Sequence, residues 1–254
     1  MLTSETNPLR IDQVTVSQTD GIIGMTFCPG KKQRSSISGH WGRDLETDLQ
    51  VIRDFGAVAL VTLMEAFELD DVEVPPNALA SLTKKMGIEW HHLPIDDVSV
   101  PDEDFDELWE YSGARLRMHL AKGRCAVIHC RGGLGRTGLV AARLLVELGY
   151  KPDQAIDEVR RARPGAIETT EQEQYVKRCQ PVADGAQTCD SGLRSLPSRQ
   201  QRRVACLLGG AVGDGFGFGV EFQALEQIRA KYGPRGLRSP QLKAGKFVVS
   251  DDTS

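Results

Sequence analysis

Ten consecutive residues, 129–138, combine side chains that can bind a tetrahedral anion and attack it. They read His129-Cys130-Arg131-Gly132-Gly133-Leu134-Gly135-Arg136-Thr137-Gly138. Glycines in such a loop let the backbone curl so that successive N–H groups point inward and form an anion-binding nest. The helix expected directly after the loop adds free N–H donors and the positive end of its dipole. The segment therefore predicts a cradle for a phosphate group, formed by Arg131, Gly132, Gly133, Leu134, Gly135 and Arg136.

Cys130 lies at the base of this cradle, where we expect it to act as a nucleophile. Helix N-termini and nearby cations can lower the pKa of a cysteine thiol to about 3.5–7.5, which favours the reactive thiolate at neutral pH. Arg136 can fold back over the loop and bind two phosphate oxygens with its planar guanidinium, which a lysine cannot do. The hydroxyl of Thr137 is expected to hydrogen-bond the cysteine sulfur and ease its departure when a phosphoenzyme is hydrolysed.

A plainer interpretation of this segment is a glycine-rich connector with a buried cysteine. That interpretation explains neither Arg136 nor its spacing from Cys130. A Walker-type nucleotide loop would need Gly-Lys-Ser/Thr where this chain has Gly-Arg-Thr. Residue types, spacing and the strand–loop–helix context instead agree with a nucleophile in a phosphate cradle.

A general acid is also expected, because an alkyl or aryl oxygen needs a proton as its bond to phosphorus breaks. The acid should lie on a separate loop at the same edge of the sheet. The loop 94–101, with a proline at each end, supplies two adjacent candidates, Asp96 and Asp97. The alternative is that both are solvated loop acids, and adjacent carboxylates cannot be told apart from sequence alone.

The elements that must position these residues alternate between strands and helices. Strands are expected at 22–27, 57–64, 88–93 and 126–128, and helices at 43–55, 76–86, 102–122, 137–148, 152–161 and 170–178. The run 57–64 is continuously apolar, which is typical of a buried parallel strand. The alternation predicts right-handed crossovers and an α/β fold, with a mainly parallel central sheet flanked by helices. Ligands bind at the carboxyl ends of the strands in such sheets.

Changes in composition divide the chain into four parts. The first 21 residues are polar and irregular, and we expect a flexible N-terminal arm over 1–21. The phosphate-binding domain should span 22–179. Residues 180–198 are rich in Pro, Ser, Gly and Asp and are interpreted as a linker. The remaining segment, 199–254, is expected to be mainly helical.

The order His-Cys, five residues, Arg, Ser or Thr, Gly resembles the signature of protein tyrosine and dual-specificity phosphatases. The nearest resemblance is to the kinase-associated (cyclin-dependent kinase inhibitor) type, over 22–179. It also rests on Val58-Ala59-Leu60-Val61-Thr62-Leu63, His91-His92-Leu93-Pro94-Ile95 and Gly165-Ala166-Ile167-Glu168-Thr169. The resemblance implies a protein tyrosine phosphatase-like fold, a cysteinyl-phosphate mechanism without a cofactor, and a shallow site that accepts phosphoserine, phosphothreonine and phosphotyrosine.

The same resemblance implies roles for four further residues. The family's segment "Pro-Ile, one residue, Asp" aligns Asp97 with the general acid and leaves Asp96 as the alternative. His129 would orient the loop through hydrogen bonds. Gln172 would help to place the hydrolytic water, although Thr169 and Gln172 equally have the spacing of a helix capping box.

The C-terminal segment contains Gly213-Asp214, Val220-Glu221-Phe222 and Ser250-Asp251-Asp252-Thr253 in that order. This order resembles the opening of an ADP-ribosylglycohydrolase, in which the Asp-Asp-Thr region ligates magnesium, a hard cation that prefers carboxylate oxygens. Ser250, Asp251 and Asp252 are therefore a candidate partial magnesium site, with Ser250 where the family more often has threonine. We expect a truncated N-terminal part of such a domain, without glycohydrolase activity. The plainer alternative is a glycine-rich helix followed by an acidic tail.

Composition limits the classes of protein that fit. The 254 residues, 40% of them hydrophobic, allow one α/β domain plus an extra segment. A net charge of -4 with both signs interspersed lacks the basic face of a nucleic-acid-binding protein. No apolar run is long enough to span a bilayer, and the N-terminus has no signal-peptide pattern. We therefore expect a cytoplasmic protein whose partner is a phosphorylated protein, not a nucleic acid or a membrane.

Three other functions remain open at this point. The first is a non-catalytic module that uses the same cradle to bind phosphoproteins, and intact Cys130, Arg136 and an aspartate candidate argue against it. The second is an ADP-ribosylglycohydrolase, or a bifunctional protein, with a regulatory N-terminal domain. The third is a thiol enzyme that handles sulfur or arsenate. The Arg-Thr-Gly ending and the upstream Pro-Ile-Asp-Asp favour a phosphatase over it.

Overall fold

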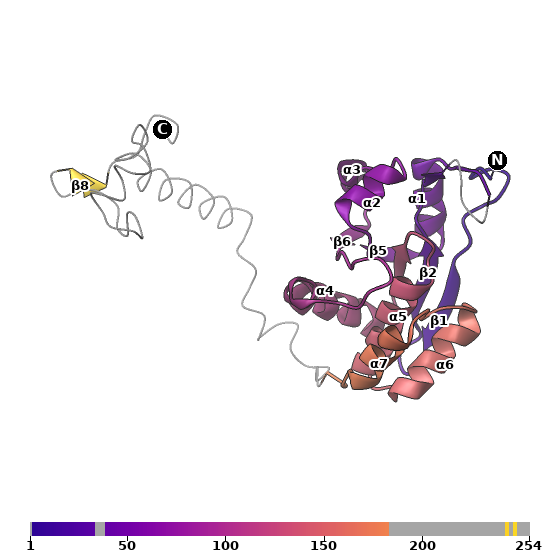
Figure 1. Ribbon diagram of the computed structural model, residues 1–254, viewed down its shortest axis with the longest axis vertical. Helices are drawn as coiled ribbons and strands as arrows, with labels where there is room; N and C mark the ends of the chain where they lie inside the picture. The colour runs from indigo at the N-terminus through magenta and orange to yellow at the C-terminus, as the bar shows by residue number, and fades with distance from the viewer. Residues whose placement is uncertain (1, 34–38, 183–241, 244–245, 248–254) are drawn as a thin grey trace. The chain divides into compact units, whose positions relative to one another are not determined.

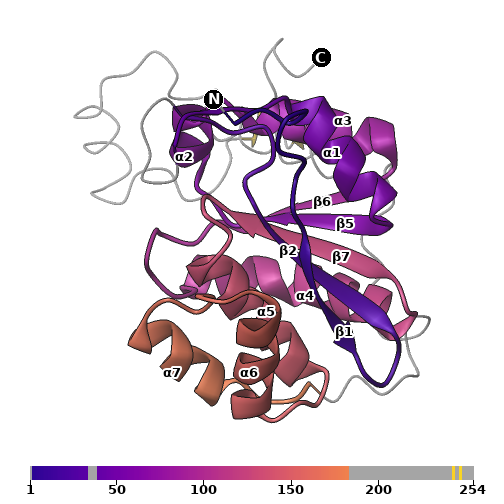
Figure 2. The ribbon, with the colours of Figure 1, turned by 90° about the vertical axis from the view of Figure 1, so that its right-hand side faces the viewer.

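The computed structural model of the protein describes residues 2–33, 39–182, 242–243 and 246–247. The chain divides into two units, Met1–Asp184 and Gly185–Ser254, and each is considered by itself. The first unit is a sheet between two groups of helices (Figures 1 and 2).

The central sheet has five strands in the order β1-β2-β7-β5-β6. These strands are β1 (Asp12–Val16), β2 (Gly21–Phe27), β5 (Ala57–Thr62), β6 (Glu89–His92) and β7 (Cys125–Cys130). All neighbours pair in parallel except β1, which is antiparallel to β2. Strand β7 lies at the centre, and all six of its residues are buried. The mainly parallel order confirms the expected α/β class.

Helices cover both faces of this sheet. One group lies on one side: α1 (Leu45–Asp54), α2 (Ala66–Asp71) and α3 (Pro76–Met86). The other group lies opposite, as Figure 2 shows: α4 (Glu103–Ala121), α5 (Gly135–Glu147), α6 (Pro152–Ala162) and α7 (Thr170–Arg178). Buried aliphatic side chains of β5 and β7 fill the space between the layers, among them Leu60, Val61, Val127 and Ile128.

The helix termini follow local sequence signals. Asp44 and Asp102 cap α1 and α4, since each side chain accepts a hydrogen bond from the backbone N–H three residues later. Pro76 and Pro152 stand at the first position of α3 and α6, where the missing N–H costs nothing. Gly87 ends α3 in the left-handed region with a φ of 75°. The predicted elements consequently lie within a few residues of the observed ones.

The N-terminus is where the prediction differs from the structure. The expected flexible arm over 1–21 contains β1, which pairs with β2 from Asp12↔Met25 to Val16↔Gly21. The sequence signal for β1 is a short alternation in which Val14 and Val16 are buried. Short edge strands offer little periodicity, and the pairing is what makes this one form. Two short strands, β3 (Lys32–Gln33) and β4 (Trp41–Gly42), and helix α2 were also not predicted.

The second unit is described only at β8 (Leu242–Lys243) and β9 (Lys246–Phe247), which pair antiparallel. The rest of the segment that was expected to be mainly helical lies outside the described residues, as do most of the expected linker and the residues Ser250, Asp251 and Asp252. Among the described helices, none has both the length and the hydrophobicity that crossing a bilayer requires.

Candidate active site

The phosphate loop, residues 130–136, connects the end of β7 to the start of α5. The backbone N–H of Gly133 donates to the sulfur of Cys130 at 3.2 Å, and Cys130 is 4% exposed. Gly133 has a φ of +73°, and a Cβ there would lie 2.3 Å from the backbone oxygen of Thr26. Only glycine fits this position, because both the backbone conformation and the neighbouring strand exclude a side chain. The loop therefore curls around the cysteine as the sequence predicts.

Arg163, at the end of α6, holds the loop from outside. Its Nε donates to the Gly133 carbonyl, and its Nη2 donates to the Gly132 carbonyl at 3.3 Å. Its Nη1 forms an ion pair of 2.6 Å with Asp12 of β1, and both side chains are largely buried. Arg163, which the sequence did not point to, thus fixes the curl of the loop by holding these two carbonyls outward. Asp12, which pairs with Arg163, belongs to β1, the strand that was not predicted.

Arg136 stands in the first turn of α5 and is 2% exposed. Its Nη1 and Nη2 donate to the two carboxylate oxygens of Glu68 in α2, at 2.6 and 2.9 Å. Burial raises the pKa of Glu68, but hydrogen bonds from Arg136 and from the backbone of Glu65 outweigh it and leave the pKa below its ordinary value. Glu68 is thus an anion that fixes the guanidinium plane. The Nε of Arg136 has no hydrogen-bond partner among the described residues and stays available to a ligand.

The acid loop, residues 94–101, meets the same guanidinium. The Ile95 carbonyl accepts from Nη1 of Arg136 at 2.9 Å, and Asp97 forms an ion pair with Nη2 at 2.9 Å. The Asp97 side chain is 66% exposed. Asp96 is also exposed, and it forms neither a hydrogen bond nor an ion pair with Arg136. The geometry thus favours Asp97 over Asp96 as the candidate acid.

His129 is fully buried and sits behind the loop. Its Nε2 shares a hydrogen bond of 2.8 Å with the hydroxyl of Thr62, which also accepts from Nε1 of Trp90 at 2.9 Å. Burial lowers the pKa of His129 to about 3, against the opposing effect of the Cys130 backbone. The imidazole is therefore neutral at neutral pH. Its Nδ1 has no hydrogen-bond partner among the described residues, so orientation of the loop by this side chain stays a prediction.

Thr137 does not make the contact expected of it. Its hydroxyl is buried and has no hydrogen-bond partner within the described part of the chain. The cysteine sulfur instead accepts the Gly133 N–H. Thr137 is the third residue of α5, and an easing of sulfur departure by its hydroxyl stays a prediction.

Gln172 forms one half of the expected helix capping box, and its role in placing the hydrolytic water stays a prediction. Its backbone N–H donates to the capping Thr169 hydroxyl at 3.1 Å. Its side chain accepts from the Glu168 N–H at 3.0 Å and donates to the Ser99 carbonyl of the acid loop at 3.1 Å. Glu168 in turn accepts the Gly135 N–H at 2.7 Å. Gln172 therefore ties the acid loop to the start of α7 beside the phosphate loop.

Comparison with known proteins identifies the family. The family model described as "Cyclin-dependent kinase inhibitor 3 (CDKN3)" matches residues 2–156. The chain belongs to this family. Rat cyclin-dependent kinase inhibitor 3 is 34% identical over 171 residues, which are 66% of this chain and 74% of that protein. Human protein tyrosine phosphatase type IVA 3 is 30% identical over 138 residues, 54% of this chain and 72% of that protein.

A solved structure agrees with this assignment. A crystal structure of kinase associated phosphatase, with its catalytic-site cysteine replaced by serine, matches with a TM-score of 0.59 and 31% sequence identity. The match covers 67% of this chain and 93% of that one. The chain is accordingly a dual-specificity protein phosphatase. Its residues 195–254 separately match the ADP-ribosylglycohydrolase family, as the C-terminal motifs indicate.

Three residues of the phosphatase site were missed by sequence reasoning: Glu68, Arg163 and Glu168. Each acts through a partner far away in the sequence, and Glu68 and Arg136 are 68 residues apart. No local spacing signals such a pair. Within the described residues, no group of three or more His, Cys, Asp or Glu side chains is arranged to hold a metal ion.

Proposed function

We propose that this phosphatase hydrolyses phosphoserine, phosphothreonine and phosphotyrosine esters of proteins through a cysteinyl-phosphate on Cys130. One observation carries the proposal: Arg136 forms an ion pair with Asp97 and lies close enough to Cys130 for the cysteine to raise the pKa of its guanidinium. Nucleophile, phosphate clamp and proton donor thus meet at the carboxyl ends of the parallel strands. All three are side chains of this chain, so the proposed reaction uses no metal or organic cofactor.

In the first step the Cys130 thiolate attacks phosphorus, and the bond from phosphorus to the substrate oxygen breaks. Arg136 binds two equatorial phosphate oxygens through Nε and Nη2, because Nη1 is committed to Glu68 and Ile95. Phosphate takes the place of Asp97 on Nη2, and this exchange releases the carboxyl to protonate the leaving oxygen. Backbone N–H groups of the loop stabilise the charge on the transferring group.

In the second step water attacks the phosphorus of the cysteinyl-phosphate. Asp97, now ionised, accepts a proton from this water, and the sulfur leaves as a thiolate while inorganic phosphate is released. Gln172 is proposed to help position the water, since its amide already bridges the acid loop and the loop before α7. Thr137 is proposed to ease the departure of the sulfur, and His129 to orient the loop.

The experiment that tests this proposal compares Cys130→Ser with Cys125→Ala, a matched change at the other end of β7. Turnover of p-nitrophenyl phosphate and of a phosphothreonine peptide is measured in EDTA. We expect Cys130→Ser to lower kcat by roughly a thousandfold or more, as removal of a nucleophile does. Cys125 is buried, its thiol pKa is raised to about 12 by burial, and its replacement should leave turnover near that of the wild type. Comparable turnover by Cys130→Ser would contradict the mechanism.

Two further proposals concern a metal site in the C-terminal segment and the location of the protein. The match of residues 195–254 to the ADP-ribosylglycohydrolase family supports a partial magnesium site at Ser250, Asp251 and Asp252, which offer hard oxygen ligands. These three lie outside the described residues. The described part also holds four free cysteines, Cys28, Cys125, Cys130 and Cys179, which supports a reducing, cytoplasmic location.

A further inference from the structure

Lys31 is a buried cation that forms no ion pair with a carboxylate of the described residues. It follows the turn that ends β2, is 5% exposed, and forms no ion pair in the described part of the chain. Its ammonium lies 4.1 Å from the ring centroid of Trp41 and 4.8 Å from that of Phe27. Aromatic faces attract a cation but do not neutralise it. A buried charge normally has an ionic partner, so the missing anion needs an explanation.

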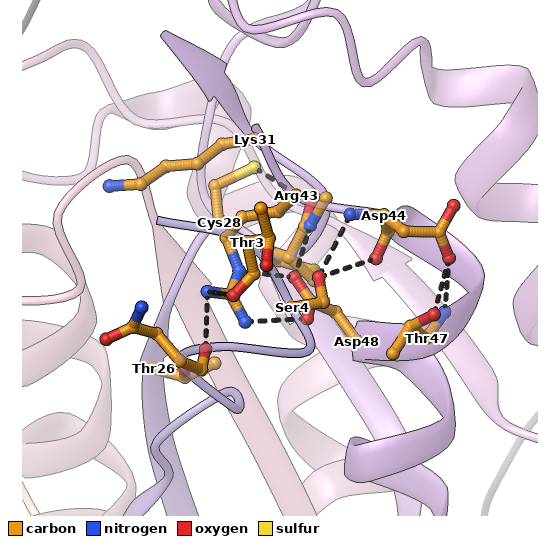
Figure 3. A network of polar contacts seen from close by, with 12 residues as sticks. Thr3, Ser4, Thr26, Cys28, Lys31, Arg43, Asp44, Thr47 and Asp48 are labelled. Atoms are coloured by element: carbon orange, nitrogen blue, oxygen red, sulfur yellow. Dashed lines mark hydrogen bonds and ion pairs between the residues drawn. The ribbon is translucent and has the colours of Figure 1, made fainter. Parts of the chain in front are cut away.

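The structure holds Lys31 in this place through a fully buried ion pair. Arg43 donates to both carboxylate oxygens of Asp48 at 2.7 Å, and neither side chain is exposed. Asp48 also accepts the N–H of Gly30 at 2.8 Å, which fixes the turn directly before Lys31. Figure 3 shows this network, with the Lys31 side chain extending away from the Arg43–Asp48 pair. Asp48 is thus committed to Arg43 and does not neutralise Lys31.

The Lys31 ammonium reaches the phosphate loop instead. It donates to the carbonyl of Arg131, the residue after Cys130, at 3.4 Å. The same carbonyl accepts the N–H of Cys28 at 3.5 Å, so it too is turned away from the cradle. Arg163 holds the next two carbonyls in the same way. Together, Lys31 and Arg163 hold three consecutive loop carbonyls away from the cradle. Lys31 also adds a positive charge next to the phosphate loop.

We propose that Lys31 is a positioning residue of the phosphatase: it fixes the Arg131 carbonyl and supplies the positive charge that favours the Cys130 thiolate and the bound phosphate. The anion missing from its surroundings is the thiolate in the free enzyme and the phosphate during turnover. This inference rests on the proposed roles of the phosphate loop. Neither a motif nor the spacing of Lys31 from other residues indicates this positioning role.

The charged groups around Lys31 agree with this role. Burial lowers the pKa of Lys31 to about 8, Cys28 and Cys130 raise it, and Arg43 and Arg131 lower it. At neutral pH the ammonium is therefore mostly protonated, and its charge is lost as the pH rises through about 8. Its influence on the nucleophile should be largest below that pH.

The test compares Lys31→Met with Lys31→Arg and with Lys32→Met, the adjacent lysine, which is half exposed and pairs with Glu73. The rate of alkylation of Cys130 by iodoacetamide is measured between pH 4 and 9, with the modified peptide identified by mass spectrometry. This readout needs no substrate, so it stays informative even if the proposed turnover fails. Lys31→Met should move the midpoint of alkylation upward by about half a pH unit, since a nearby cation is lost. Lys31→Arg and Lys32→Met should keep the wild-type midpoint.

Turnover gives the second readout. For p-nitrophenyl phosphate, kcat/KM of Lys31→Met should fall by roughly threefold to tenfold at pH 6, and the loss should shrink above pH 8, where the wild-type lysine is itself neutral. An unchanged alkylation midpoint, or an equal loss of kcat/KM at every pH, would assign Lys31 a purely structural role and overturn the inference. If Lys31→Met fails to fold by circular dichroism, Lys31→Gln provides a second neutral variant for the same comparison.

Discussion

Arg136 of the phosphate loop pairs with Asp97 of the acid loop, yet Cys130 and Arg136 are buried whereas Asp97 is exposed. In the phosphate loop, Cys130 and Arg136 are 4% and 2% exposed, and three of the loop carbonyls are fixed by Lys31 and Arg163. In the acid loop, the Asp97 side chain is 66% exposed and makes an ion pair with Arg136. The backbone of this loop is held at Ile95 and Ser99, on either side of the acid.

This difference matches two separate tasks of the proposed reaction, stabilisation of charge on the phosphate and transfer of a proton. Charge on the transferring phosphate is stabilised best by groups that are already in place, because no reorganisation is then needed at the moment of reaction. In the proposed mechanism Asp97 must instead leave the guanidinium, approach the leaving oxygen and later accept a proton from water. A buried acid with fixed partners could not serve all these positions. Rigidity of the clamp and accessibility of the acid are therefore complementary requirements.

The largest expected effect comes from the shared guanidinium. Arg136→Lys keeps the charge but loses the planar pair of donors, and Glu68 loses its bidentate partner. We expect kcat/KM for a phosphothreonine peptide to fall by about a thousandfold. Arg161→Lys is the matched control, because its side chain is 69% exposed and pairs with Glu158 on the surface of α6. A loss of less than tenfold in Arg136→Lys would show that clamp geometry is not needed.

The acid loop should give a smaller and substrate-dependent effect. Asp97→Asn removes the proton donor, so kcat for a phosphothreonine peptide should fall by about a hundredfold. Turnover of p-nitrophenyl phosphate should change little, because its leaving group needs little protonation. Asp96→Asn is the control one residue away. If Asp96→Asn shows the larger peptide-specific loss, Asp96 is the acid and the contact of Asp97 with Arg136 is only structural.

The outer support of the phosphate loop should give the smallest effect of the three. Arg163→Gln removes the ion pair to Asp12 and weakens the hold on the Gly132 and Gly133 carbonyls. Displacement of the loop should lower kcat/KM by about tenfold and weaken inhibition by vanadate to a similar extent. Arg161→Gln, on the exposed side of α6, should leave both values unchanged. Equal values for Arg163→Gln and Arg161→Gln would mean that the loop keeps its shape without this support.

Features that depend on residues close together in the sequence could be predicted, whereas contacts between distant residues could not. The alternation of elements, the phosphate loop and the pair Asp96–Asp97 are local patterns, and they predicted the α/β fold and the candidate residues of the site. Glu68, Lys31 and Arg163 act on the loop across 68, 100 and 30 residues, and no spacing signals those contacts. Strand β1 was missed for the same reason, since its stability comes from pairing with β2.

The register of the sheet has a consequence for how the enzyme is assembled. Strand β2 pairs with β7 from Ile22↔Cys125 to Phe27↔Cys130, and Lys31 meets Arg131 across 100 residues of chain. We expect such non-local pairing, with its high contact order, to form late, because the closure entropy of the long intervening segment must first be overcome. The nucleophile therefore enters its cradle only when the central strand docks. Recovery of phosphatase activity during refolding reports completion of the sheet, whereas helix content reports earlier events.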